Sequence, residues 1–165
     1  MSTAPTRPVR IVRILHRKYA SEPFSGKGGL VAPSRWASAG QLVSYAAESL
    51  ALAALETIAG AGRMGRLTDM VYVAATLNQA AIHAPPKERL PDGWNRRPPG
   101  DASRRFGDKW LNAREEVALR VPSVVIPDGW NYVINAAHPH TSEVLTLVEE
   151  PKPLELDPRI LERLS

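Results

Sequence analysis

Residues 34–60 read SRWASAGQLVSYAAESLALAALETIAG, and this stretch decides how the chain folds. The segment QLVSYAA at 41–47 predicts a short strand. From Glu48 onward, alanine and leucine dominate and predict a helix, because both favour helical backbone. Glu48 or Ser49 can serve the first turn of this helix, and Gly60 can end it. A strand followed at once by a helix predicts a fold that contains both kinds of element.

Outward from this stretch, apolar and β-branched segments predict further short strands. These are VRIVRIL at 9–15, DMVYVAATL at 69–77, VALRVPSVVI at 117–126, NYVIN at 131–135, VLTLV at 144–148 and a shorter stretch at 154–156. A second helix is predicted over 101–116, with Asp101 as its cap and with Phe106 and Trp110 packed inward. Because short strands outnumber helices, the predicted fold class is α+β: a mixed, mostly antiparallel β-sheet core with a few flanking helices.

The length of 165 residues predicts one domain, over residues 9–165, after a flexible tail at 1–8. Glycine and proline make 20–40 and 84–100 loops, and 20–40 is long enough to be a functional loop. The chain has no cysteine, which excludes disulfides, thiolate metal sites and cysteine nucleophiles. No apolar run approaches the ~20 residues of a membrane helix, and the start MSTAPTRPVR lacks the apolar core of a signal peptide. We therefore expect a cytoplasmic protein that does not enter a membrane.

The positive charge of the chain is concentrated at one end. Residues 1–35 hold seven Lys or Arg against the single acid Glu22, which gives them a charge of +6. Residues 36–165 carry −2, so the net charge of the chain is +4. A local basic region suits an anionic ligand such as a nucleic acid, a phosphate group or an acidic partner segment. The alternative is a solvated basic face without a ligand.

Glu56 is the most informative single residue. It lies on the predicted helix about 40° around from Leu52, and its neighbours one turn away are apolar or small. Because this helix is apolar nearly all round, we expect it to be buried. A buried carboxylate is costly unless it is paired or faces a polar cavity. The alternatives are an acid paired with a structural arginine and an acid that points outward at the rim.

Three further residue types suit a ligand site. Arg35 closes the glycine-rich loop, and the planar fork of a guanidinium matches a phosphate, although no P-loop motif is present. Tyr45 lies near the end of a predicted strand, where a tyrosine is more often part of the core. Ser123 follows Pro122 and can be aimed into a cleft, or can simply bond to backbone; no GxSxG motif surrounds it. The histidines show no metal-ligand spacing, so no metal is expected.

In their order along the chain, these segments resemble the RES-domain family, the toxin half of RES–Xre toxin–antitoxin pairs, over residues 10–161. VRIVRILHRKYASEPFSGKGG resembles the family's opening strand and its SGxGa loop, and SRWASAGQLVSYAAESLALAALE resembles its GGRWN-to-glutamate segment. The resemblance continues through LPDGW at 90–94, GDKWL at 107–111, ALRVPSVVIP at 118–127, NYVIN at 131–135, HP at 138–139 and DPRIL at 157–161. Two positions depart from the family pattern: Ala37 stands in place of an asparagine, and the acid often found before the NYLLN-like segment is replaced.

The resemblance implies an ADP-ribosyltransferase-like fold that takes NAD⁺ as its substrate and breaks the nicotinamide–ribose bond. ADP-ribose would then pass to water, to phosphate or to a protein target. Matched position by position, Arg35 would hold the pyrophosphate, Tyr45 would orient the nicotinamide ribose end, and Glu56 would stabilise the positive sugar. Ser123 would hydrogen-bond the ligand or position Glu56, and Arg13 matches a second recurrent arginine of the NAD⁺ site.

The resemblance also implies a cognate Xre-type, DNA-binding antitoxin that covers or plugs the active-site cleft. The complex, rather than this chain, would bind operator DNA. Two other classes of function remain open. A small basic nucleic-acid-binding module would use the N-terminal region, although the sequence has no recognisable reading helix or aromatic platform. A non-catalytic interaction domain would lack at least one of the four motif side chains, and this chain has all four.

Overall fold

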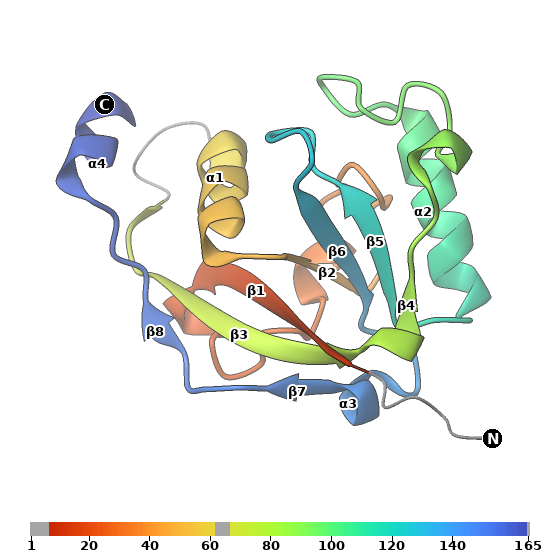
Figure 1. Ribbon diagram of the computed structural model, residues 1–165, viewed down its shortest axis with the longest axis horizontal. Coiled ribbons are helices and arrows are strands. Elements are labelled where there is room, and N and C mark those ends of the chain that lie inside the picture. Colours follow the sequence, from red (N-terminus) through yellow and green to blue (C-terminus); the bar gives the residue numbers. More distant parts are fainter. Residues whose placement is uncertain (1–6, 62–66, 165) are drawn as a thin grey trace.

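The computed structural model describes residues 7–61 and 67–164. Eight strands and four α-helices are found in these residues. The strands are β1 Pro8–His16, β2 Val43–Ala47, β3 Met70–Asn78, β4 Ile82–His83, β5 Ala118–Pro122, β6 Trp130–Asn135, β7 Leu145–Leu147 and β8 Lys152–Pro153. The helices are α1 Leu50–Ala61, α2 Asp101–Ala113, α3 Thr141–Val144 and α4 Pro158–Leu164 (Figure 1). The predicted α+β class is confirmed. Most of the predicted tail, residues 1–6, lies outside the described residues, and Pro8 opens β1.

One sheet runs in the order β4-β5-β6-β2-β1-β3-β7, and β8 also pairs with β3. All of its pairs are antiparallel except β4 with β5. Strand β1 pairs with β3 along its whole length, but it pairs with β2 only at Val12 and Ala47. The sheet therefore consists of two halves that meet at this seam between β1 and β2, and the halves run in different directions in Figure 1.

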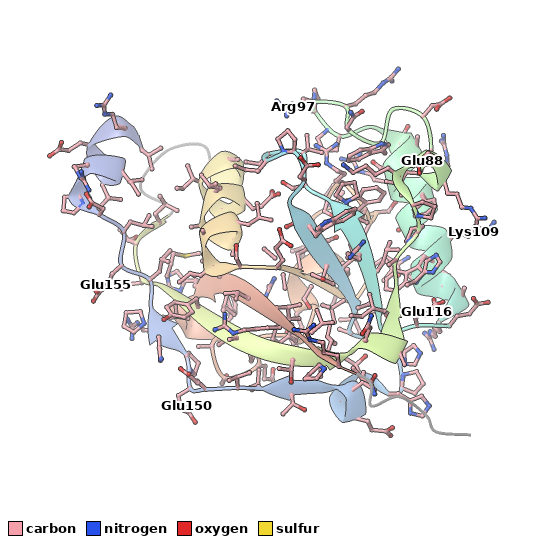
Figure 2. All side chains as sticks on the ribbon, in the orientation of Figure 1. Glu88, Arg97, Lys109, Glu116, Glu150 and Glu155 are labelled. Carbon is pink, nitrogen blue, oxygen red and sulfur yellow. The ribbon has the colours of Figure 1, made fainter. Side chains whose placement is uncertain are left out.

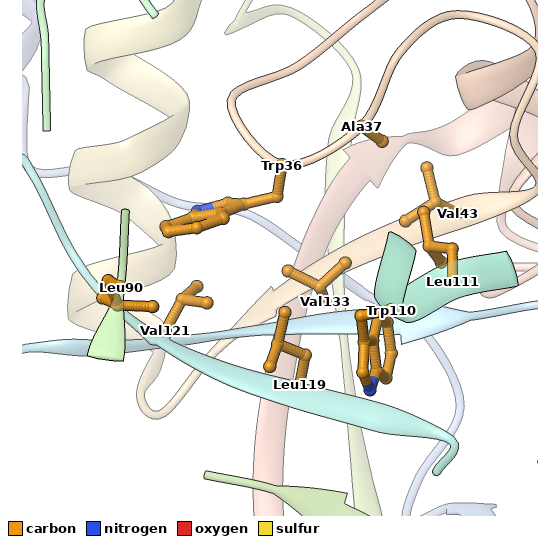
Figure 3. Close-up of a cluster of buried hydrophobic side chains, with 9 residues drawn as sticks. All are labelled: Trp36, Ala37, Val43, Leu90, Trp110, Leu111, Leu119, Val121 and Val133. Carbon is orange, nitrogen blue, oxygen red and sulfur yellow. The ribbon is translucent and has the colours of Figure 1, made fainter. Parts of the chain in front are cut away.

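Helix α2 closes one face of the β5–β6 half. Its Trp110 and Leu111 are buried against Leu119, Val121 and Val133 of the sheet (Figure 3). Phe106 packs against the same cluster, so the predicted inward face of this helix is confirmed. Burial of aromatic and aliphatic side chains of this size is the main source of stability for such a layer.

Helix α1 covers the seam with one side only. Leu52 and Ala53 are buried in a cluster with Val12 and Ala47, whereas Leu55 is 39% exposed. The predicted burial of this helix is therefore correct on one side only, because the strands cover only that side. Ser49 accepts a hydrogen bond from the Leu52 amide at 3.1 Å, as predicted for the first turn, and the helix passes through Gly60 to Ala61.

Other boundaries also differ from the sequence-based predictions, and α2 ends at Ala113 rather than at 116. Asp101 is the first residue of α2 rather than its cap. The N-cap position is Gly100, so no side chain caps this helix. Strand β5 ends at Pro122, so Ser123 lies just beyond the strand. The strand predicted at 154–156 is instead β8 at Lys152–Pro153, and β4, α3 and α4 were not predicted.

Over residues 7–61 and 67–164, no helix combines the length and the apolar character that a bilayer crossing requires. The same residues contain no group of three or more histidine, cysteine, aspartate or glutamate side chains that is placed to hold a metal ion.

Candidate functional site

A cavity of about 610 Å³ opens where the two halves of the sheet separate. Its walls are formed by strands β1 and β2, helix α1, the segment 34–36, the loop 97–99, the end of β5 with Val124 and Val125 beyond it, and Asn131 of β6. Arg13, Arg35, Tyr45 and Glu56, which are four of the five predicted site residues, all line it. The fifth, Ser123, is only 5% exposed and reaches the site through Glu56. The five side chains thus converge on one hollow.

Glu56 is held in place by two neutral donors, one just after β5 and one on β6. The Ser123 hydroxyl and the Asn131 amide Nδ2 each donate to Glu56 Oε1 at 2.7 Å. Among the described residues, Oε2 receives no hydrogen bond, although the side chain lines the cavity. The site therefore fixes a carboxylate by one oxygen and leaves the other oxygen to a ligand.

Ser123 has a fixed orientation because its own backbone neighbours determine it. The amides of Val125 and Ile126 donate to its Oγ at 3.0 and 3.1 Å. With its lone pairs used in this turn, the hydroxyl hydrogen points to Glu56. Of the contacts expected for Ser123, the structure contains the one to Glu56.

Arg35 sits at the cavity wall opposite α1. Its Nη1 donates to the carbonyls of Trp94 and Arg96 at 2.9 and 2.7 Å, which anchors it to the proline-rich loop. Among the described residues, none accepts from its Nε or Nη2. Burial lowers the pKa of Arg35, the nearby Glu56 charge opposes this, and Arg97 lowers the pKa further. A guanidinium stays charged despite such shifts, so Arg35 presents a cation to the cavity.

Helix α2 holds the segment that carries Arg35. The Asp108 carboxylate accepts from the Ser38 amide and hydroxyl at 2.9 and 2.6 Å, and Arg104 Nε donates to the Ser34 carbonyl at 2.9 Å. Gly107 allows the closest approach: a Cβ built on it would lie 1.6 Å from the Trp36 carbonyl oxygen. The position of Arg35 therefore depends on a helix almost seventy residues away in the sequence.

Tyr45 lines the same cavity from β2, and its hydroxyl forms a very short contact with the Ser34 hydroxyl. Burial raises the pKa of Tyr45 to about 12, and the hydrogen bond to Ser34 offsets only part of this effect. The phenol is accordingly neutral at physiological pH and available as a hydrogen-bonding group.

The raised pKa of Tyr45 predicts a stability change at alkaline pH. The folded chain keeps this phenol protonated up to pH about 12, whereas the unfolded chain ionises it near pH 10, so folding loses stability as the pH rises above 10. We expect the free energy of unfolding of wild type to fall by about 1 kcal/mol relative to Tyr45→Phe between pH 9 and pH 11. Urea denaturation of both proteins at the two pH values measures this. An unchanged difference would contradict the burial of this phenol.

Arg13 bridges the seam of the sheet. Its Nη1 donates to the Tyr45 carbonyl at 2.9 Å across the gap between β1 and β2, and its Nε donates to the Pro23 carbonyl at 2.7 Å. Burial lowers the pKa of Arg13, with a smaller opposing effect from Tyr45. Arg13 thus ties both half-sheets and the 20–40 loop together beside the cavity.

Two cavity residues escaped the sequence analysis. Asn131 bonds Glu56, and Arg97 lines the mouth and donates from Nη2 to the Val124 carbonyl. Figure 2 labels Arg97 at the upper edge of the molecule. Asn131 opens the quoted NYVIN segment, which gave a signal for a strand but none for a site. Arg97 lies in an irregular segment without periodicity, so no local pattern marks it.

The charges of the cavity define the ligand it suits. Among the residues that the structure describes, three arginines and one glutamate are the charged residues of its lining. Grouped guanidinium ions without a matching number of carboxylates favour a ligand with phosphate-like charge. Glu56 adds a fixed negative group in the same hollow, which favours a positive centre elsewhere on that ligand.

Several known proteins are similar in sequence to this chain. The model of the RES domain family matches residues 8–157. A protein of Sphingobium sp. (strain YBL2) named Prs ADP-ribosylating toxin is 36% identical over 127 residues, which are 74% of this chain and 78% of that protein. A protein of Yersinia enterocolitica (serotype O:8 / biotype 1B, strain NCTC 13174 / 8081) named Toxin Res is 26% identical over 150 residues, 91% of this chain and 98% of that one.

A solved structure has a similar fold. It is the crystal structure of the M. tuberculosis MbcT–MbcA toxin–antitoxin complex, and the matched chain has a TM-score of 0.72. The match covers 96% of this chain and 90% of that one at 16% sequence identity. At this level of identity the likeness is one of fold.

Proposed function

This chain belongs to the RES domain family, and we propose that it is the toxin of a toxin–antitoxin pair and that it cleaves the nicotinamide–ribose bond of NAD⁺. The observation that carries the proposal is the carboxylate of Glu56, held by Ser123 and Asn131 in a cavity that arginines also line. The relative named Prs ADP-ribosylating toxin supports the use of NAD⁺ as the source of ADP-ribose.

The proposed reaction needs a group that stabilises positive charge. When the bond from ribose C1′ to nicotinamide breaks, the electron pair leaves with nicotinamide, which departs as a neutral molecule. The sugar becomes oxocarbenium-like, and no proton has to be supplied to the leaving group. Glu56 stabilises this cation through the oxygen that its two donors leave open. A nucleophile then bonds to C1′ and releases a proton.

The remaining cavity residues bind the dinucleotide. Arg35 holds the pyrophosphate with Nε and Nη2, while its Nη1 stays on the loop carbonyls. Arg97 adds a second guanidinium at the mouth, and Tyr45 orients the nicotinamide ribose end with its neutral hydroxyl. Arg13 acts through the backbone that it clamps beside Tyr45. The residues fit NAD⁺ because its anionic and cationic parts match the two kinds of charge in the cavity.

The fate of ADP-ribose and the partner follow from the same proposal. The acceptor is water, phosphate or a protein side chain, since each reacts with the same sugar cation. Because the structural neighbour is part of a toxin–antitoxin complex, we propose that a cognate Xre-type antitoxin neutralises this chain by covering the cavity mouth. Binding of operator DNA belongs to that complex.

Nicotinamide release tests the proposal. Purified protein is incubated with NAD⁺ labelled in the ADP-ribose part, with phosphate, without phosphate, and with a cell extract. Release of nicotinamide together with labelled ADP-ribose, its phosphate ester or a labelled protein supports the function and identifies the acceptor. No release of nicotinamide under all three conditions would refute it.

Arg35→Lys tests the pyrophosphate contact. A lysine has a point charge rather than a fork, so it loses the paired bonds to the ligand and the two anchors on Trp94 and Arg96. We expect the KM for NAD⁺ to rise about 10-fold or more while kcat changes less, because mainly ground-state binding is removed. Steady-state kinetics measure both constants. Arg105→Lys on α2, which is not part of the cavity lining, is the control; equal kinetics for the two variants would contradict the assignment.

A further inference from the structure

We propose that Asn131 is a positioning residue for Glu56. We also propose that the orientation of Asn131 toward Glu56 lowers the stability of the fold. This inference rests on the proposed function, because Glu56 is the group whose position matters. The two residues lie 75 positions apart in the sequence, on β6 and on α1, and only the folded chain brings them together.

Asn131 reaches Glu56 from β6, and it also lines the cavity. It stands near the start of β6, paired with Ala47 of β2 on one side and Val121 of β5 on the other. A residue between two paired strands has little freedom to move, and its Nδ2 lies 2.7 Å from Glu56 Oε1. The amide is therefore a rigid reference point for the carboxylate above it.

Two donors are needed to fix the carboxylate. A single hydrogen bond from Ser123 would leave the Glu56 side chain free to pivot around that contact. Asn131 supplies a second bond to the same oxygen from a different element, and both bonds measure 2.7 Å. Together they set the plane of the carboxylate and hold Oε2 toward the hollow. A displacement of about 1 Å at such a group lowers a rate about 100-fold.

The other half of the Asn131 amide shows what this arrangement costs. Its Oδ1 is buried and has no hydrogen-bond partner among the described residues. Turning the amide over would place Oδ1 against Glu56 Oε1, oxygen against oxygen, so Glu56 dictates the orientation that leaves Oδ1 alone. A buried polar atom without a partner destabilises a fold.

Asn135, four positions later on the same strand, provides the matched comparison. Its Nδ2 donates to the Leu111 carbonyl at 2.9 Å and its Oδ1 accepts from the Ala137 amide at 3.1 Å, so both ends of this amide have partners. It is 2% exposed and is not part of the cavity lining. Asn135 is thus a structural amide of the same type on the same strand.

The test replaces each asparagine by leucine, which has nearly the same shape and no polar atoms. For Asn131→Leu we expect kcat for nicotinamide release to fall about 100-fold, with KM nearly unchanged and Tm equal to or above that of wild type. For Asn135→Leu we expect a lower Tm, because two backbone groups lose their partners, and an unchanged kcat for the folded fraction. Asn131→Ala is measured in parallel and should show the same fall in kcat, although the void left by the smaller side chain lowers its Tm.

Several results would overturn the inference about Asn131. An unchanged kcat in both Asn131 variants, or a Tm that falls for Asn131→Leu as it does for Asn135→Leu, would overturn the inference, and so would a failure of both Asn131 variants to fold. If wild type releases no nicotinamide from NAD⁺, it is the proposed function that fails, and the Tm comparison still shows whether Asn131 weakens the fold.

Discussion

Glu56→Gln should reduce nicotinamide release from NAD⁺ about 1,000-fold while leaving the protein folded. Glutamine has the same shape, and its carbonyl oxygen can still accept from Ser123 and Asn131 at the position of Oε1. What is lost is the negative charge opposite the developing sugar cation. Because the proposed function assigns substrate binding to the arginines, the loss should appear in kcat far more than in KM.

Release kinetics and a melting curve measure this prediction together. Glu48→Gln is the control, because Glu48 is an exposed acid just before α1 whose side chain accepts from the Trp130 amide, a role that glutamine also fills. Wild-type rates are expected for this control. Full activity of a folded Glu56→Gln protein would remove Glu56 from the proposed mechanism. If the variant also suppresses growth inhibition on overexpression, the enzymatic activity accounts for toxicity.

Gly107→Ala should lower Tm by about 10 °C and disturb the site from a distance. The added methyl group would overlap the Trp36 carbonyl oxygen, 1.6 Å away, so α2 and the segment beside Arg35 must separate. The cost is about 3 kcal/mol of unfolding free energy, because packed backbone has to move. Since Arg35 is carried on that segment, KM for NAD⁺ should rise in the surviving folded protein.

Gly60→Ala is the matched control, a second helical glycine changed in the same way. A Cβ there meets nothing within 4 Å, and alanine favours helix over glycine by about 1 kcal/mol, so Tm should stay equal or rise. Thermal denaturation of both variants gives the comparison. Equal Tm values for Gly107→Ala and wild type would mean that α2 does not contact Trp36 as closely as described.

Local sequence patterns predicted most of the longer strands and helices. They failed for features that depend on contacts with residues distant in the sequence. The strand and helix at 41–60 follow from residues that favour those backbones, and both formed. The exposure of Leu55 did not follow, because it depends on how much of α1 the strands cover rather than on the apolar character of the helix. Helix α4 is short and has none of its residues buried, so it left no clear periodic signal.

The site divides in the same way. Arg35, Tyr45, Glu56 and Ser123 were found by their place in an ordered set of motifs, and the structure gathers them at one cavity. Asn131 was predicted only as part of a strand. Its contact with the site is a hydrogen bond to Glu56, 75 positions away, which no local pattern indicates. Arg97 gave no signal because an irregular proline-rich loop carries it to the mouth. Their roles in NAD⁺ cleavage remain predictions for the variants above.

The place of β6 in the sheet has a consequence for the newly made protein. Strand β2 lies between β6 and β1, yet it pairs with β1 at one position only, so nearly all of its partners come from β6. A nascent chain that the ribosome has extended only as far as β5 has no such partner for β2, and Glu56 has no Asn131. Pairing across so long a stretch of chain is slow. The proposed site is therefore incomplete until β6 has been synthesised and has paired with β2.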